Sequence, residues 1–163
     1  MKNVIFLDVD GVLHPFHEHV PESEITTFHN PCMEALQSLV KVIDAEIILS
    51  SSWRNFQSTR ERLQTNLAKY DLRFSAWIEP DSSTQPGGAS VSAKKMSKIL
   101  AYVHAHHPTE WIVLDDEDLV SLSCQDPSST MSLLFSSRFV RTDPKIGLTN
   151  FDVDRAIEII KSE

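Results

Sequence analysis

Near its amino end the chain reads Val4-Ile5-Phe6-Leu7-Asp8-Val9-Asp10-Gly11-Val12-Leu13, with four apolar residues running into two acids and a glycine. An unbroken apolar run of this kind predicts a strand that is buried on both faces, as in a parallel sheet. Side chains two positions apart in an extended segment point the same way, so we expect Asp8 and Asp10 to converge. Two close carboxylates repel each other, and a hard cation such as Mg²⁺, which prefers oxygen ligands, would relieve the repulsion. Gly11 then permits a sharp turn.

Two later apolar runs also end in polar residues. Trp111–Leu114 leads into Asp115 and Asp116, and Ala45–Leu49 leads into Ser50-Ser51-Ser52-Trp53-Arg54. The carboxyl ends of parallel strands lie at one edge of an open α/β sheet, where ligands bind. We therefore expect one metal site made by acids from both ends of the chain. Its candidate ligands are Asp8, Asp10, Asp115 and Asp116, with Asp118 behind them or simply at the surface.

The remaining segments alternate between helical and extended patterns. This alternation predicts a three-layer α/β/α sandwich with a mostly parallel, Rossmann-like sheet, in a single domain over residues 1–163. We expect helices over 31–43, 55–70, 93–106 and from 150 to about 161, further strands over 72–78 and 138–142, and a loop over 80–91. The segment 121–137 has no clear pattern. The expected caps are Asn30, Ser52 or Asn55, Ser92, and a capping box of Thr149 with Asp152.

Composition bounds the class of protein. The 163 residues are 41% hydrophobic and 23% charged, which is ordinary for a globular domain, and the net charge of −8 argues against a general nucleic-acid binder. It does not exclude an enzyme that acts on a nucleic-acid end. Cys32 and Cys124 imply no disulfide framework, and the start of the chain does not resemble a signal peptide, so we expect a reducing compartment, the cytoplasm. No apolar run approaches the roughly 20 residues of a membrane span.

Histidines and lysines offer two more candidate positions. His14, His17 and His19 are spaced like zinc ligands, but no cysteine lies nearby, and we expect no zinc there. Lys94 and Lys95 fall in the first turn of a predicted helix, where a cation is unfavourable unless an anion compensates it. Lys95 stands four residues before an apolar position and so leans toward the buried face, which favours it over Lys94.

The motifs together resemble those of the haloacid dehalogenase (HAD) superfamily over nearly the whole chain. The Asp-x-Asp-Gly-Val-Leu stretch resembles motif I, the strand that ends in serine resembles motif II, and Asp115-Asp116 resembles motif IV. Ser51 is the favoured motif II residue and Ser50 the alternative. Lys95 resembles motif III. The run Ser-Ser-Ser-Trp-Arg resembles the branch described as the HAD domain in Swiss Army Knife RNA repair proteins, although the Arg-Gly that this branch often has at motif III is absent.

The resemblance implies a Mg²⁺-dependent phosphatase. Asp8 would be the nucleophile that forms an aspartyl-phosphate, and Asp10 would be the general acid and base. The metal would be held by Asp8, the Asp10 backbone carbonyl, and Asp115 or Asp116. Catalysis would be completed by Ser51 and Lys95, and the substrate-binding candidates are Gly11, Ser52 and Arg54, of which the last can bind an anion bidentately.

The substrate is less constrained than the chemistry. Neither the segment after motif I nor the segment between motifs II and III has room for a sizeable cap domain, so we expect an open site. Such a site could take a bulky phosphorylated substrate, a nucleic-acid end or a phosphoprotein, with Arg54, Arg141 and Lys145 as a cationic rim. A small phosphate ester, with the site closed by an oligomer partner, and a non-catalytic HAD-like binding domain are the alternatives. The oligomeric state stays open.

Overall fold

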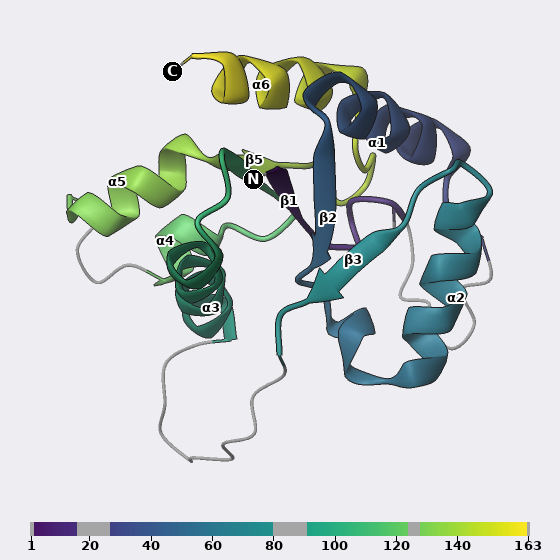
Figure 1. The fold of residues 1–163 in the computed structure, drawn as a ribbon, viewed down its shortest axis with the longest axis horizontal. Helices are drawn as coiled ribbons and strands as arrows, with labels where there is room; N and C mark the ends of the chain where they lie inside the picture. The colour runs from purple at the N-terminus through teal and green to yellow at the C-terminus, as the bar shows by residue number, and fades with distance from the viewer. Residues whose placement is uncertain (1, 16–26, 80–90, 124–127, 163) are drawn as a thin grey trace.

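The structure, a computed structural model, describes residues 2–15, 27–79, 91–123 and 128–162 (Figure 1). Its strands are β1 (Asn3–Leu7), β2 (Ala45–Leu49), β3 (Phe74–Trp77), β4 (Trp111–Asp115) and β5 (Phe139–Arg141). Its helices are α1 (Asn30–Ile43), the 3₁₀ helix η2 (Ser52–Asn55), α2 (Gln57–Ala68), α3 (Val91–His106), α4 (Leu119–Ser123), α5 (Thr130–Ser137) and α6 (Asn150–Lys161).

The five strands form one sheet in the order β3-β2-β1-β4-β5, and all four pairings are parallel. This confirms the predicted α/β fold. The chain builds outward from β1 to β2 and β3 on one side, then crosses to β4 and β5 on the other. The gap between β1 and β4 is therefore the topological switch point of the sheet, where ligands bind in folds of this class. The described residues include no cap domain.

Alternate side chains of the central strands pack in two separate hydrophobic cores. Ile5 and Leu7 of β1 pack in one core with residues from α1, α2 and α6, whereas Val4 and Phe6 pack in the other with residues from α3, α4 and α5. Figure 1 shows the same division, with α3, α4 and α5 gathered on one side of the sheet. Burial on both faces explains why β1 and β4 are apolar without alternation. The three-layer sandwich is confirmed.

Several predicted helix starts were wrong. His29, not Asn30, stands at the N-cap of α1, and α3 begins at Val91, so Ser92 lies inside that helix. After β2 the chain forms a separate 3₁₀ turn that Ser51 caps, and Phe56 takes the N-cap position of α2 without a side-chain bond. The Phe56 side chain is exposed.

The predicted capping box is confirmed. The Thr149 hydroxyl accepts from the Asp152 backbone N–H while the Asp152 carboxylate accepts from the Thr149 N–H. The serine-rich segment without a clear pattern, 121–137, contains the end of α4 and the whole of α5. Phe135 is buried in α5, but several of its other apolar side chains are exposed, which is why no helical periodicity was visible. Across the described residues, the helices are too short or too polar to cross a bilayer.

Candidate metal and phosphate site

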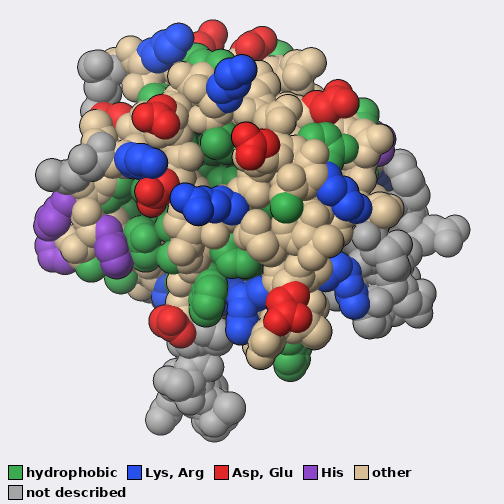
Figure 2. Space-filling model, turned by 45° about the vertical axis from the view of Figure 1, so that its right-hand side comes forward, with side chains coloured by type: hydrophobic (Ala, Val, Ile, Leu, Met, Phe, Trp, Pro, Cys, Tyr) green, Lys and Arg blue, Asp and Glu red, His purple; other side chains and the backbone are tan. Residues whose placement is uncertain are grey.

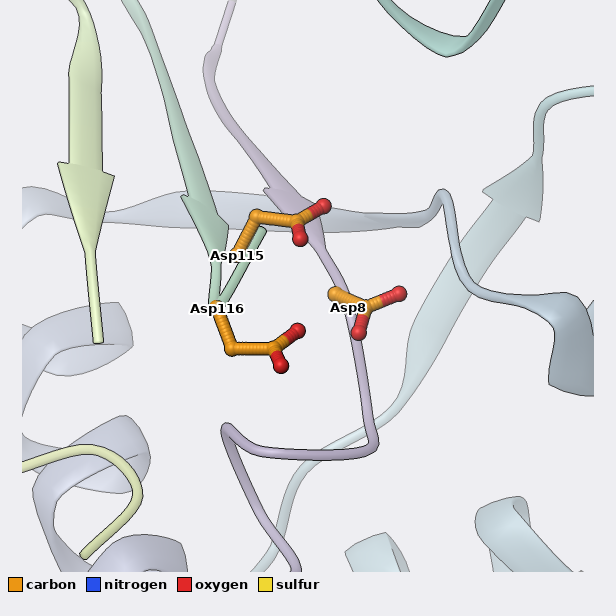
Figure 3. Close-up of side chains that lie close together, drawn as sticks. All are labelled: Asp8, Asp115 and Asp116. Carbon is orange, nitrogen blue, oxygen red and sulfur yellow. The ribbon is translucent and has the colours of Figure 1, made fainter. Parts of the chain in front are cut away.

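Three carboxylates meet at the switch point. Asp8 directly follows β1, Asp115 ends β4, and Asp116 is the next residue. One oxygen from each lies within 4.8 Å of the others, and Figure 3 shows the three side chains approaching one another from the ends of the two strands. Asp8 and Asp115 are buried, and the Asp8 backbone N–H donates to the Leu114 carbonyl at 3.0 Å, which fixes the first strand against the fourth.

Lys95 is the cation that pairs with this cluster. Its Nζ lies 2.9 Å from Asp8 Oδ1 and 2.5 Å from Asp115 Oδ2. Burial alone would lower the pKa of Lys95, but the two carboxylates outweigh it and raise that pKa, so the ammonium stays charged. Three ionised carboxylates and one ammonium leave two formal negative charges at the site.

The surroundings of Asp115 and Asp116 disfavour the ionised forms of these two carboxylates. Burial, and then the charge of Asp8, raise the pKa of Asp116 to about 6, and the same two causes raise the pKa of Asp115 although Lys95 opposes the shift. Ionised carboxylates held close in this way suit a divalent cation with oxygen ligands, whose charge would balance the excess. The residues present therefore fit Mg²⁺.

Gly11 lies directly against the Asp116 side chain of the cluster. It has φ +72°, and a Cβ at this position would lie 2.6 Å from the Asp116 carboxyl carbon. Its carbonyl accepts from the Thr142 hydroxyl at 2.8 Å, and the Thr142 backbone N–H donates to the Asp115 carbonyl at 2.9 Å. Gly11 is thus needed for the turn and for the space that Asp116 occupies.

The Asp10 side chain is not one of the three clustered carboxylates. Because β1 ends at Leu7, strand alternation does not extend to Asp10. Its two carboxylate oxygens instead accept from the indole Nε1 of Trp53, at 3.3 and 3.1 Å. Trp53 is completely buried and its ring packs against Phe28. The indole therefore fixes where the Asp10 carboxylate points.

The serines after β2 are placed differently from one another. Ser50 and Ser51 are both buried, whereas Ser52 is exposed. Ser51 Oγ accepts from the Trp53 backbone N–H at 3.4 Å and keeps its own proton to donate. Ser50 Oγ has no partner among the described residues. Arg54 Nη1 donates to the carbonyls of Ser50 and Ser51, at 2.9 and 2.7 Å, so this guanidinium braces the loop.

The other two expected rim cations, Arg141 and Lys145, lie at different places around the site. Arg141 Nε donates to the Asp116 carbonyl at 3.1 Å, which places it beside the carboxylate cluster. Lys145 lines a cavity of about 550 Å³ together with His14 and His29. His17 and His19 lie outside the described residues, so the prediction about zinc at the three histidines stays untested.

Sequence reasoning missed two supporting residues. Trp53 was noted only as part of a motif, although a buried indole N–H generally requires an acceptor, and that rule could have suggested a nearby acid. Thr142 bridges Gly11 and Asp115 from the end of β5, and no local pattern in the sequence marks it.

The chain matches a model of a known protein family. The model described as the HAD domain in Swiss Army Knife RNA repair proteins matches residues 4–153, which include all the residues of the cluster. No curated protein matches the chain.

Proposed function

The chain belongs to the family of HAD domains in Swiss Army Knife RNA repair proteins, and from this premise we propose that it is a Mg²⁺-dependent phosphatase of nucleic-acid ends. The observation that carries the proposal is the bridge from Lys95 to Asp8 and Asp115, with the Asp116 carboxylate beside them. A buried ammonium between carboxylates suits a site that must accept a phosphate dianion next to an anionic nucleophile.

Asp8 is the proposed nucleophile. Lys95 holds Asp8 through Oδ1, which leaves the other carboxylate oxygen to attack phosphorus. The bond from the Asp8 carboxylate oxygen to phosphorus forms an aspartyl-phosphate (an acyl phosphate) as the bond to the leaving oxygen breaks, and Asp10 donates a proton to that oxygen. Water then attacks the aspartyl-phosphate and gives its proton to Asp10, so phosphate leaves and Asp8 is restored. A carboxylate nucleophile divides one difficult displacement into two easier ones.

The other site residues have supporting roles. Asp8, Asp115 or Asp116, and the Asp10 backbone carbonyl would hold Mg²⁺, which supplies charge neutralisation between the nucleophile and the phosphoryl oxygens. Lys95 would bind a phosphoryl oxygen in place of its hydrogen bond to Asp8.

The phosphate would also be held from the second strand. The Ser51 hydroxyl can donate to a phosphoryl oxygen, and Ser50 is the alternative donor. Gly11 and Ser52 would line the substrate path. Arg54 would contribute positive potential while it braces the serine carbonyls.

The substrate class rests on two observations. The family description refers to RNA repair, and the described residues provide no cap domain over the carboxyl edge of the sheet. An uncovered site has room for the end of a polymer, and the family description favours a nucleic-acid end over a small phosphate ester.

Phosphate release tests the proposal. We would assay 5′- and 3′-phosphorylated oligonucleotides, a phosphopeptide and a sugar phosphate, each with Mg²⁺ and with EDTA. Asp8→Asn should retain its circular dichroism spectrum and lose ~10³-fold or more of kcat, the scale expected for a covalent nucleophile. Asp118→Asn, at a surface acid near the cluster, is the matched control and should retain activity. Retained turnover in folded Asp8→Asn would refute the mechanism.

A further inference from the structure

An aromatic and arginine surface lies at the carboxyl edge of the sheet and has no part in the proposed hydrolysis. Phe56 at the start of α2 is 65% exposed, and Trp77 at the end of β3 is 36% exposed. The Arg60 guanidinium lies over the Trp77 ring, 4.6 Å from its centroid. We call these three side chains the stacking surface.

Arg60 is the member of the stacking surface that its surroundings hold in place. Arg60 follows Phe56 by one helical turn, and its backbone N–H donates to the Phe56 carbonyl at 3.1 Å, so the two residues lie on the same side of α2. The Arg60 guanidinium also donates to the carbonyl of Arg54. A guanidinium fixed by a carbonyl and by a ring has already lost its rotamer freedom, so binding a flat ligand on it costs little further entropy.

The stacking surface lies within reach of the carboxylate cluster. Trp77 is in register with Leu49, and Leu49 is in register with Leu7, the residue before Asp8. Two steps across a sheet at ~4.8 Å each give a separation of about 10 Å at the backbone. That distance equals about three nucleotide rises of ~3.4 Å in a stacked strand. A chain whose terminal phosphate lies at Asp8 can therefore present one of its first bases here.

The side chains of the stacking surface favour a nucleobase as the ligand. Bases stack on aromatic rings and on arginine planes, and the stacking is tolerant of sequence. Lys98, whose Nζ donates to the Glu79 carbonyl at 2.9 Å, adds a further cation close to the end of β3. Figure 2 shows Lys and Arg side chains with hydrophobic side chains between them, among some acidic ones, on the lower part of this face, where α2 begins in Figure 1. A phosphopeptide would use the cations but has no need of two exposed rings.

We propose that Phe56, Arg60 and Trp77 stack an unpaired base within the first three nucleotides of a single-stranded nucleic acid whose terminal phosphate lies at Asp8. The inference rests on the proposed function and adds a residue-level basis for substrate choice. A base that is already paired and stacked in a duplex cannot insert against the rings, so single-stranded ends are preferred over blunt duplex ends.

The first test separates stacking from hydrolysis. Phe56→Ala removes an exposed ring and leaves both cores intact. Its kcat/KM on a phosphorylated single-stranded oligonucleotide should fall about 5- to 150-fold, the equivalent of ~1–3 kcal/mol for one stacked base. Its kcat/KM on ribose 5-phosphate, and on the oligonucleotide made abasic at its first three positions, should not change, and Phe56→Trp should behave like the native chain. Phe151→Ala, at a ring that is 77% exposed on α6, is the matched control and should affect none of these substrates.

The second test does not need turnover. In the Asp8→Asn background, the oligonucleotide should quench Trp77 fluorescence, with Trp77→Phe identifying the signal and Phe56→Ala weakening the binding. Quenching that depends on Phe56, together with no hydrolysis of any ester by the native chain, would support the stacking surface and refute the phosphatase. Hydrolysis that Phe56→Ala leaves unchanged, or tighter binding of a blunt duplex, would overturn the stacking surface and leave the phosphatase standing.

Discussion

Neutralising Asp116 should stabilise the metal-free protein. Its carboxyl is partly exposed, and burial together with the charge of Asp8 raises its pKa from 3.8 to about 6. Each pKa unit corresponds to ~1.36 kcal/mol, so the shift of about two units gives an upper value of ~3 kcal/mol. Solvent screens a partly exposed group, and we take about half, ~1.5 kcal/mol. For a chain of this length, Asp116→Asn should then raise Tm in EDTA by ~3–6 °C at pH 8.

The pH dependence has a definite sign. A carboxyl whose folded-state pKa is raised destabilises the fold above that pKa, and the penalty disappears as pH falls to its unfolded value. The advantage of Asp116→Asn should therefore be largest at pH 8, smaller at pH 5 and absent below about pH 4. Asp118→Asn is the control, because a hydrogen bond from the Ser121 N–H lowers the pKa of Asp118, and neutralising it should give no gain.

In Mg²⁺ the native chain should have a higher Tm than Asp116→Asn, the reverse of the order in EDTA. Excess Mg²⁺ that binds only the folded state stabilises it by RT ln(1 + [Mg²⁺]/Kd), so a lower Kd gives a larger gain. Tm of the native chain should therefore rise with Mg²⁺, while Tm of Asp116→Asn should rise much less. Differential scanning calorimetry in EDTA and in Mg²⁺ measures both effects. A lower Tm for Asp116→Asn in EDTA at pH 8, or equal Mg²⁺ shifts for the two proteins, would refute the electrostatic reasoning.

Further measurements probe the remaining parts of the site. Gly11→Ala should weaken Mg²⁺ binding, measured by titration calorimetry, because its methyl group would collide with the Asp116 carboxylate. The control is Gly147→Ala, which also places alanine at a positive φ, +77°, and should lower Tm without weakening Mg²⁺ binding. Trp53→Phe should lower kcat ~10-fold with little change in KM, because Asp10 loses the indole hydrogen bond that orients its carboxyl, and a hydrogen bond of this kind contributes ~1 kcal/mol or more. An unchanged kcat would contradict this role of Trp53. Of Ser50→Ala and Ser51→Ala, we expect the second to raise KM for phosphate esters more, and the reverse order would assign the phosphate contact to Ser50. Finally, Mg²⁺ affinity should fall as pH drops from 8 to 6, because protons compete for ligands whose pKa values are raised, and a pH-independent affinity would contradict this.

The apolar strands with their terminal acids were predictable from sequence. Burial on both faces makes β1 and β4 unbroken apolar runs, and an acid at the end of such a run has few structural explanations. Lys95 was also found, because a cation near the start of a helix and on its inner face needs an anion, and the structure places two carboxylates there.

Other features depend on tertiary contacts that leave no local pattern. The direction of the Asp10 side chain is set by Trp53, which arrives from the segment after β2. Thr142 joins Gly11 and Asp115 from the last strand. The helix expected over 55–70 begins only at Gln57, because the chain forms a separate 3₁₀ turn first, and Phe56 between the two is exposed.

The strand order has a consequence for synthesis. Strand β1 lies between β2 and β4, but β4 follows it by about 100 residues, which takes a ribosome ~5–20 s. During that interval one edge of this apolar strand lacks its native neighbour, and an unpaired edge of this kind invites pairing with other chains. The carboxylates of Asp8 and Asp115 meet only when β4 joins the sheet. A divalent ion bound between them would therefore fasten an early-made strand to a late-made one, so that its binding marks the completion of the fold.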